Sequence, residues 1–325
     1  MGGLARRATI IRDLEKQGTH LLILDAGNSF FKAQDSPSSK ERKKAGLIAT
    51  AYQRMGYHAV NVGFNDLLAG IRFLTGLQKE ANLPLISANL LDGMGGKPVF
   101  KTHVVLDAGG TKVGLLGLTS DVPFRERTAP EGYFVSNPVA AAKRVAAELA
   151  GNCDIIVALC NMGSFKEYTN LVQQVEQVDF IFGSGGKGSY HQTIRSDGGW
   201  KALLFQIYPK GQYLGRIDFK VVEEARDFVD LSHKARMEKQ LERIERQLDM
   251  YRSGTGMAKS MPQDKREEYI KRLEEFKERT GAHMKKLELD SQPKGTFVSN
   301  PIRLDDKVKD NPEIKGLVDR FNKGS

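Results

Sequence analysis

The sequence predicts an α/β fold, in which a layered domain of alternating helices and strands is followed by an antiparallel helical hairpin. Over residues 1–222, short apolar runs typical of buried strands alternate with amphipathic helical segments. After residue 222 the apolar residues repeat at heptad spacing, and 44 of the last 103 residues are charged against 45 of the first 222. We therefore expect a main domain over 1–222, a helical hairpin over 223–290, and a returning strand with a C-terminal connector over 291–325.

Apolar periodicity gives the elements of the main domain in order. The segment 4–14 places its apolar residues on one helical face, and the apolar run 21–25 ends in a small-residue loop, as a buried strand would. The same two patterns predict helices at 41–55, 67–80, 139–149 and 165–175, and strands at 59–63, 85–88, 155–159 and 180–182.

The later strands are expected to be antiparallel. Ala108-Gly109-Gly110 separates two apolar runs, which predicts a hairpin of strands 103–106 and 112–118. Further strands are expected at 192–195, 203–207 and 214–219. Alternating helices and strands that end in antiparallel strands are typical of a layered α/β domain.

Two heptad helices are expected in the hairpin. The first has apolar residues four and three apart at Met237, Leu241, Ile244, Leu248 and Tyr251, and the second has the same spacing at Tyr269, Leu273, Phe276, Thr280 and His283. Because a loop with Gly and Pro joins the helices, we expect them to fold back antiparallel. The hairpin, over 231–289, either packs on its own domain or serves as a coiled-coil arm for self-association or for a protein partner. Residues 296–304 would then return as a strand, and a last short helix would begin at Pro312.

Composition excludes several classes of protein. A chain with 40% hydrophobic residues can bury a core, and no apolar run approaches the ~18 residues of a membrane span. Cys153 and Cys160 cannot form a disulfide scaffold, and no haem-attachment motif occurs. The net charge of +9 forms no basic stripe, and its sharpest cluster, 40–44, is typical of a solvated helix start, so nucleic acid is not an expected partner. No signal peptide is visible.

Five segments occur in an order that a generic α/β pattern does not explain, namely Gly2–Ala8, Leu24–Phe30, Met55–Val60, Leu85–Asn89 and Val113–Thr119. Together they resemble the 5'-nucleotidase family of periplasmic metallophosphoesterases, which includes the UDP-sugar hydrolases and lies within the calcineurin-like superfamily. The resemblance covers about residues 2–220. It implies a four-layer αββα sandwich and an extracytoplasmic setting.

The chemistry of that family rests on two divalent metal ions, such as Mn²⁺ or Zn²⁺, bridged by a carboxylate. By resemblance, the bridging aspartate falls on Asn28, and an amide cannot supply that anionic bridge. The Gly-Asn-His-Glu motif falls on 63–66, which places Phe64 at a ligand position, Asn65 at the catalytic histidine and Asp66 at the glutamate.

The remaining ligand positions also carry other residues. The Ser-His motif falls on Cys160-Asn161, and the late Gly-His-x-His motif places Gly185 and Lys187 where two imidazoles would stand. The family's first strand, with its Asp-x-His pair, would precede Gly2, so we expect the sequence to be a piece of a longer protein. The six histidines lie elsewhere. We therefore expect a degenerate enzyme that binds no metal, and we assign no catalytic residue.

Three features suggest functions other than metal chemistry, and each also has a simpler structural interpretation. Ser184, Gly185, Gly186 and Lys187 form a loop that either binds an anion through backbone N–H groups or is a surface turn. Asp25, Asn28, Asn65, Asp66 and Asn161 are expected to line one crevice at strand carboxyl ends, able to hold a phosphate or a sugar.

Asp66 would then recruit a single weak cation or remain a solvated loop carboxylate. Cys160 is either an exposed reactive thiol or an inert one, whereas Cys153 is expected to be a small packing residue.

Two functional hypotheses of different class follow. The preferred one is a non-catalytic binding or scaffold module. The alternative is a metal-dependent phosphoesterase that hydrolyses nucleotides or sugar nucleotides. The segment 311–323 resembles the connector that precedes a multihaem cytochrome region in some bacterial chains, so this chain would be the non-haem part of a larger protein.

Overall fold

The structure, a computed structural model, describes residues 3–18, 20–32, 36–125, 132–185, 190–207, 211–222, 228–287 and 295–324. The chain divides into two compact units. The first comprises Met1–Leu214 and Pro301–Ser325, and the second comprises Gly215–Asn300. The domain boundaries at 222 and 290, drawn from composition, stay predictions.

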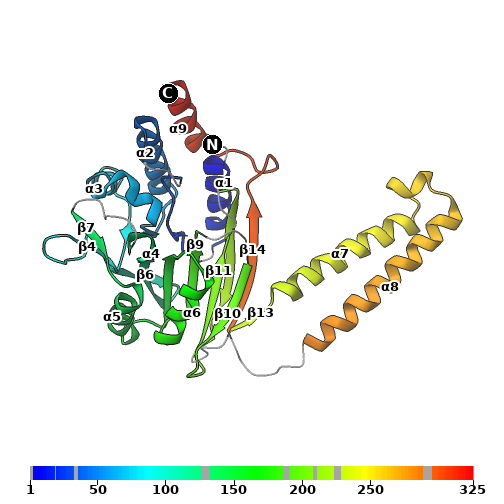
Figure 1. The fold of residues 1–325 in the computed structure, drawn as a ribbon. Coiled ribbons are helices and arrows are strands. Elements are labelled where there is room, and N and C mark those ends of the chain that lie inside the picture. Colours follow the sequence, from blue (N-terminus) through cyan, green and yellow to red (C-terminus); the bar gives the residue numbers. More distant parts are fainter. Residues whose placement is uncertain are drawn as a thin grey trace. The chain divides into compact units, whose positions relative to one another are not determined.

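Two sheets form the centre of the first unit (Figure 1). The smaller sheet is parallel and has the order β1-β2-β3 (Leu24–Asp25, Ala59–Asn61, Leu85–Ile86). The larger sheet is mixed and has the order β10-β11-β9-β8-β6-β5. Its strands are β5 (His103–Ala108), β6 (Thr111–Thr119), β8 (Ile155–Asn161), β9 (Phe180–Ser184), β10 (Tyr190–Arg195) and β11 (Lys201–Gln206). The predicted mixed α/β fold is confirmed.

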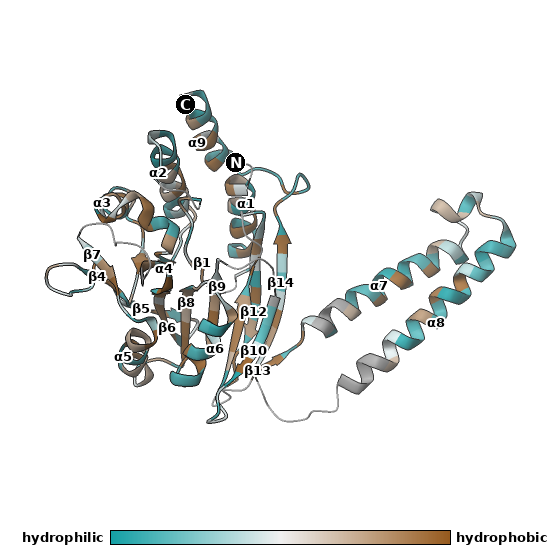
Figure 2. Cartoon of the chain, viewed as in Figure 1, coloured by the Kyte–Doolittle hydropathy of each residue, from teal (hydrophilic) through white to brown (hydrophobic). Residues whose placement is uncertain are grey.

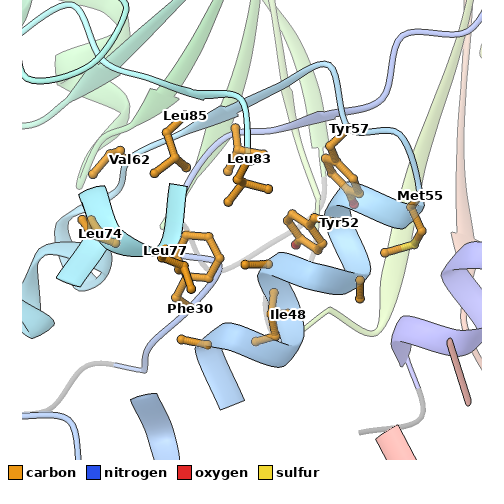
Figure 3. Close-up of a cluster of buried hydrophobic side chains, with 14 of the residues drawn as sticks. Phe30, Ile48, Tyr52, Met55, Tyr57, Val62, Leu74, Leu77, Leu83 and Leu85 are labelled. Carbon is orange, nitrogen blue, oxygen red and sulfur yellow. The ribbon is translucent and has the colours of Figure 1, made fainter. Parts of the chain in front are cut away.

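Each sheet is packed against its own helices. The smaller sheet shares a core with α1 (Gly3–Glu15), α2 (Ser39–Arg54), α3 (Ile71–Ala81) and α9 (Pro312–Lys323). The larger sheet shares a second core with α5 (Pro138–Ala150) and α6 (Phe165–Gln174). Figure 3 shows part of the first core, where Phe30, Ile48 and Leu77 lie among buried side chains from the loop after β1, from α2 and from α3.

Strand β2 lies against β6 and β8, so the two sheets face each other. Gly117 of β6 allows this close approach, because a Cβ atom there would lie 2.6 Å from Asn61 Oδ1 and 2.8 Å from the Ile86 carbonyl oxygen. The Asn61 amide crosses the same gap, since its Nδ2 donates to the carbonyls of Ala26 and Leu118.

Several element boundaries differ from the predictions. The expected helix over 67–80 is wrong at its start, because Phe64–Ala69 forms a separate 3₁₀ helix, η1, and Gly70 (φ 83°) divides it from α3. The predicted strand over 21–25 is regular only at Leu24–Asp25. Three short elements were not expected, namely β4 (Leu90–Asp92), β7 (Tyr133–Val135) and α4 (Val122–Arg125). Strands β4 and β7 pair with each other across some forty residues, so neither has a local sequence signal.

The second unit contains most of a three-stranded sheet and two long helices. The sheet has the order β12-β14-β13 (Tyr213–Lys220, Gly295–Arg303, Phe228–Asp230), and β13 and β14 are parallel. Helices α7 (Ser232–Arg252) and α8 (Gln263–Leu287) run antiparallel and are joined through a 3₁₀ helix, η2 (Gly256–Ser260) (Figure 1).

The seam between α7 and α8 is buried mainly near the connecting loop. Ile244, Leu248, Tyr251 and Leu273 form one buried cluster with Ala258 of η2. The heptad prediction is wrong at Phe276, whose side chain is 42% exposed. The side chain of His283 lies outside the described residues.

We predict opposite stability effects for two glycine-to-alanine changes. Gly117→Ala should lower the free energy of unfolding by about 1–3 kcal/mol, because its methyl group would press on the opposing sheet. Gly46→Ala should raise it by about 0.5–1 kcal/mol, because Gly46 lies within α2 and an added methyl group would meet open space. Urea unfolding, followed by circular dichroism, measures both free energies of unfolding. If the two variants changed this free energy equally, the close approach of the two sheets at Gly117 would be contradicted.

Candidate functional site

Buried polar side chains gather at the carboxyl ends of the parallel strands in the first unit. Asn61 ends β2, Thr119 ends β6 and Asn161 ends β8, and all three side chains are almost fully buried. Ligands of parallel α/β sheets bind beyond such strand ends. We therefore expect a functional site at the carboxyl ends of these strands.

Asp66 organises the loops at this edge. Its Oδ2 accepts hydrogen bonds from the backbone N–H groups of Asn28 (2.8 Å) and Gly63 (2.9 Å), and its Oδ1 accepts one from Phe30 N–H (2.9 Å). Its side chain is fully buried. Burial raises the pKa of Asp66 to about 7, although the three donors act in the opposite direction. The predicted solvated loop carboxylate is therefore wrong, and both oxygens are already engaged by the backbone.

Asn28 and Asn65 are joined in the same way. The Oδ1 of Asn28 accepts a hydrogen bond from the backbone N–H of Asn65 at 2.8 Å. Asn28 has a left-handed backbone (φ 62°), a conformation that asparagine tolerates better than most residues. Gly63 packs so tightly here that a Cβ atom would lie 2.4 Å from Asn28 N.

Asn161 bonds this edge to the neighbouring strand end. Its Oδ1 accepts from the backbone N–H of Phe64 (2.8 Å), and its Nδ2 donates to Ser184 Oγ (2.9 Å). The Ser184 hydroxyl in turn donates to the Ala26 carbonyl (2.8 Å). Three loops are thus tied together by side chains that sequence reasoning placed at one site.

Asp25 also has internal partners. Its carboxylate accepts from Gly27 N–H (2.9 Å), from Ser29 Oγ (2.6 Å) and from the Tyr52 hydroxyl (2.8 Å). The predicted crevice residues are therefore connected through backbone and side-chain hydrogen bonds rather than left facing an open pocket.

The sequence analysis missed the second layer of this network. The guanidinium of Arg7 donates to the hydroxyls of Tyr52 and Tyr57 (2.9 Å each), and the two tyrosine rings stack at 3.9 Å. Burial and the Asp25 carboxylate raise the pKa of Tyr52 well above its usual value. Figure 3 labels the tyrosine pair beside the core. No spacing in the sequence indicates this contact, because Arg7 is some forty-five residues from Tyr52.

An aromatic pair lies beside the loops. Phe64, which stands where the family resemblance expects a metal ligand, meets Phe124 of α4 edge to face, with ring centroids 5.1 Å apart. A phenyl ring offers no lone pair to a metal ion.

The residues present do not fit a pair of bridged metal ions. Such a site needs carboxylate and imidazole ligands with free lone pairs, whereas most side chains that meet here are amides, a hydroxyl and a phenyl ring. The two carboxylates already have partners: Asp66 is bonded to three N–H groups, and Asp25 to one N–H group and two hydroxyls. Over the described ranges, no group of three or more His, Cys, Asp or Glu side chains could hold a metal ion. The suggested weak cation at Asp66 has no support in this geometry.

The remaining predicted site residues have mixed outcomes. Cys160 is fully buried and burial raises its thiol pKa, so the reactive-thiol interpretation is wrong. Cys153 is half-buried against the second core, as expected of a packing residue. Gly185 follows β9 with φ 94°, but Gly186 and Lys187 lie outside the described residues, so anion binding by this loop stays a prediction.

A hollow of about 380 Å³ in the first unit lies away from this site. Its lining comes from the end of α1, the segment before β1, the residue before β2 and the end of β5, and it includes His20, His58 and Asp107. None of the predicted site residues lines it. This hollow is therefore separate from the hydrogen-bonded site.

Sequence comparison with curated proteins finds several 5'-nucleotidases. A snake venom 5'-nucleotidase of Gloydius brevicauda is 27% identical over 250 residues, covering 67% of this chain and 40% of that protein. The Homo sapiens 5'-nucleotidase is 27% identical over 256 residues, covering 72% of this chain and 43% of that protein. No family model matches the sequence.

Solved structures give the same fold. A 5'-nucleotidase precursor from Thermus thermophilus has a TM-score of 0.59 at 22% identity, over 67% of this chain and 46% of that chain. The calcineurin-like phosphoesterase YfkN from Bacillus subtilis has a TM-score of 0.61 at 15% identity, over 98% and 88%.

The mixed α/β fold of the chain therefore resembles that of calcineurin-like phosphoesterases and 5'-nucleotidases. In sequence, about two thirds of the chain is similar to curated 5'-nucleotidases at 27% identity. It spans about two fifths of the length of the curated relatives that it matches. In the part of the chain that the structure describes, no helix is both long enough and apolar enough to cross a membrane.

The raised pKa of Asp66 predicts a specific pH dependence. Because the folded-state pKa of about 7 lies above the ordinary value of 3.8, the folded state binds more protons than the unfolded state between these values. The Asp66 contribution to stability is therefore complete below about pH 3.8 and is lost as the pH rises to about 7. The stability difference between wild type and Asp66→Asn should shrink over this range, by up to about 1.4 kcal/mol per pH unit.

Urea unfolding between pH 4 and pH 8 measures this difference. Asp13→Asn, which removes an exposed carboxylate, controls for the loss of a charge. If the difference instead grew with pH, the three N–H donors would outweigh burial, and Asp66 would be ionised throughout.

Cysteine labelling tests the burial of Cys160. In the native chain we expect a thiol reagent to modify Cys153 slowly and to leave Cys160 unmodified, because Cys160 is inaccessible and its thiol pKa is raised. Both should react in denaturant. Peptide mass spectrometry identifies the modified residue. Rapid labelling of Cys160 in the native chain would refute the burial of this β8 side chain.

Proposed function

We propose that this chain is a 5'-nucleotidase-like domain that no longer holds a dinuclear metal site and acts as a binding or scaffold module. One observation carries the proposal. Most side chains at the strand ends are hydrogen-bonded to the loop backbones or to one another, through Asn28 Oδ1 with the Asn65 backbone N–H, Asp66 with three N–H groups, and Asn161 with Phe64 and Ser184.

The arrangement of layers supports the assignment of these positions. Helices pack on each of two facing sheets, which agrees with the four-layer αββα sandwich of the family. In this correspondence the ligand positions are Asn28, Phe64, Asn65, Asp66, Cys160, Asn161, Gly185 and Lys187. The hydrogen-bonded amides then take over a structural task that metal coordination performs in an active enzyme, because both tie the same loops together.

A phosphate-containing small molecule remains the proposed ligand. The relatives named 5'-nucleotidase favour nucleotide-like compounds, and the loop that begins at Ser184 and Gly185 supplies glycine at the edge of the site. The Ser184 hydroxyl is already bonded to Asn161 and Ala26, so backbone N–H groups would have to make the anion contacts.

The alternative function is metal-dependent hydrolysis of nucleotides or sugar nucleotides. It is favoured by the names of the relatives and opposed by the donor set at the site. For either function we propose an extracytoplasmic setting and a place in a larger, cytochrome-associated protein, both by family resemblance. A snake venom protein among the relatives is consistent with the first of these.

Metal content and turnover test the proposal together. The purified chain is incubated with Mn²⁺ or Zn²⁺, desalted and assayed by plasma mass spectrometry, and phosphate release from adenosine monophosphate and a UDP-sugar is measured in the same samples. We expect well under one equivalent of metal per chain and no turnover, with an active 5'-nucleotidase as the positive control.

Asn28→Asp is the informative variant. One restored carboxylate should not create a site, because the other ligand positions stay as amides and a phenyl ring. About two equivalents of metal in the wild type, with hydrolysis, would refute the scaffold proposal and favour the phosphoesterase.

A further inference from the structure

The six-stranded sheet of the first unit has an open edge at β5. This strand stands last in the order β10-β11-β9-β8-β6-β5, and β6 is its only partner among the strands that the structure describes (Figure 2). The outer side of an edge strand carries a row of backbone N–H and C=O groups that no ladder uses. The free side of β5 can therefore accept a further strand.

The turn after β5 fixes which of its residues face the free edge. Gly109 (φ 71°) and Gly110 (φ 89°) both have positive φ angles, as a two-residue type I′ hairpin requires. Ala108 and Thr111 flank this turn as a hydrogen-bonded pair, and along the ladder every second pair is of this kind. The residues between these pairs direct their backbone groups away from β6, and they are His103, Val105 and Asp107.

Strand β6 confirms this alternation. Lys112, which lies opposite Asp107, donates its backbone N–H to Asp154 Oδ2 at 2.7 Å, and its carbonyl accepts from the Asp154 N–H at 2.9 Å. Asp154 lies just before β8, on the side of β6 away from β5. Because both members of a non-hydrogen-bonded pair point outward, the backbone groups of Asp107 face the free edge.

The edge lacks most of the features that commonly keep edge strands apart. Strand β5 pairs with β6 residue for residue from His103 to Ala108, so no β-bulge interrupts it. Its sequence, HVVLDA, contains neither proline nor lysine. The Val105 side chain near its centre is 45% exposed. Such an edge is suited to pairing with a second strand, and its one carboxylate, Asp107, selects against partners that place a like charge there.

Three side chains stand along one face of this edge, in the order His103, Val105 and Asp107. They share a face because alternate residues of a strand point the same way. His103 identifies this face as the one towards α5, since its Nδ1 lies 3.9 Å from Glu148 Oε2. Nδ1 also lies 3.0 Å from Thr102 Oγ1, so Nε2 is the ring nitrogen left for a new partner. The edge thus carries an imidazole at one end, a valine in the middle and a carboxylate at the other end.

We propose that two copies of this chain associate through β5, with the two strands antiparallel about a two-fold axis at Val105. Each Val105 then faces its counterpart, and His103 of each copy faces Asp107 of the other. The outward backbone groups of all three residues meet in hydrogen-bonded pairs. Apolar contact lies in the centre, and an imidazole N–H meets a carboxylate on either side. The edge is therefore complementary to its own reversed sequence, which favours a second copy over an unrelated strand.

The register and the size of the assembly follow from these side chains. An axis one residue further along β5 would set Val105 opposite Asp107, and an axis one residue earlier would set it opposite His103, so both lose the match. A two-fold contact is isologous, so it closes at two copies. One short strand per copy makes a small interface, so we expect a weak dimer that depends on concentration. The dimer uses no residue of the strand-end site, so it concerns the partner of the proposed scaffold and not its lost metals.

Sedimentation equilibrium of the full chain, over about 5 to 500 μM, tests the proposal. The average mass should rise with concentration from that of one chain toward that of two chains and no further. Val105→Pro should weaken the dimer at least about tenfold, because proline has no N–H to donate and is tolerated where that N–H faces outward from an edge strand. Val105→Thr, the matched control, keeps the N–H and the branched side chain and should dimerise as the wild type does.

Exchanging the end groups tests the register. Asp107→Lys places a lysine opposite an imidazole, and His103→Asp places two carboxylates opposite each other, so each variant alone should dimerise at least about tenfold more weakly. An equimolar mixture of the two variants should form a mixed dimer, because each copy then supplies the charge that the other lacks. Circular dichroism and urea unfolding check that every variant remains folded.

Three outcomes would overturn the proposal. The first is a chain that stays monomeric at every concentration, and binding of a synthetic peptide of alternating valine and lysine along β5 would then assign the edge to another partner. The second is a dimer that Val105→Pro leaves intact. Its loss in Phe276→Glu would place the contact on the hairpin, where Phe276 is exposed. The third is a mixture of the two charge variants that fails to form the mixed dimer.

Discussion

The Asp66 carboxylate holds the strand-end loops of this protein in place. It binds backbone N–H groups of Asn28, Phe30 and Gly63, so it joins the loop after β1 to the start of η1. A buried carboxylate without partners would be costly, and here three donors offset part of that cost. The loops in turn set the positions of Asn65, Phe64 and Asn161. The site therefore depends on an internal hydrogen-bond network where its family relatives are expected to depend on metal ions.

Burial within the sandwich makes this network rigid. The two sheets approach so closely at Gly117 that the Asn61 amide donates to carbonyls from both sides of the gap. On the other side of the loops, Asp25 is fixed by Tyr52, and Tyr52 is bonded to Arg7 of α1. The engaged oxygens of Asp66, Asn161 and Ser184 have little capacity left for a ligand. A binding function therefore has to use the rim of the site, whereas a scaffold function needs only the shape.

The hairpin adds a different kind of surface. Its short apolar seam is buried mainly near the loop that joins α7 and α8, and most of its length is charged. Two ion pairs join the helices, Arg252 with Glu274 and Lys277 with Glu245. Because these pairs are exposed, they add little to the stability that the apolar seam provides.

The sequence by itself indicated the α/β fold class, most elements and the likeness to 5'-nucleotidases. Periodicity is local, so helices such as α1, α5 and α6 and strands such as β8 followed from spacing alone, and the motif order indicated the 5'-nucleotidase family. Only the tertiary structure decided what the site residues do. Asp66 is buried rather than solvated, Cys160 of β8 is buried in the second core, and Arg7 reaches Tyr52 from another helix. The physical reason is that burial and hydrogen-bond partners depend on which distant segments meet, and no local pattern records those meetings.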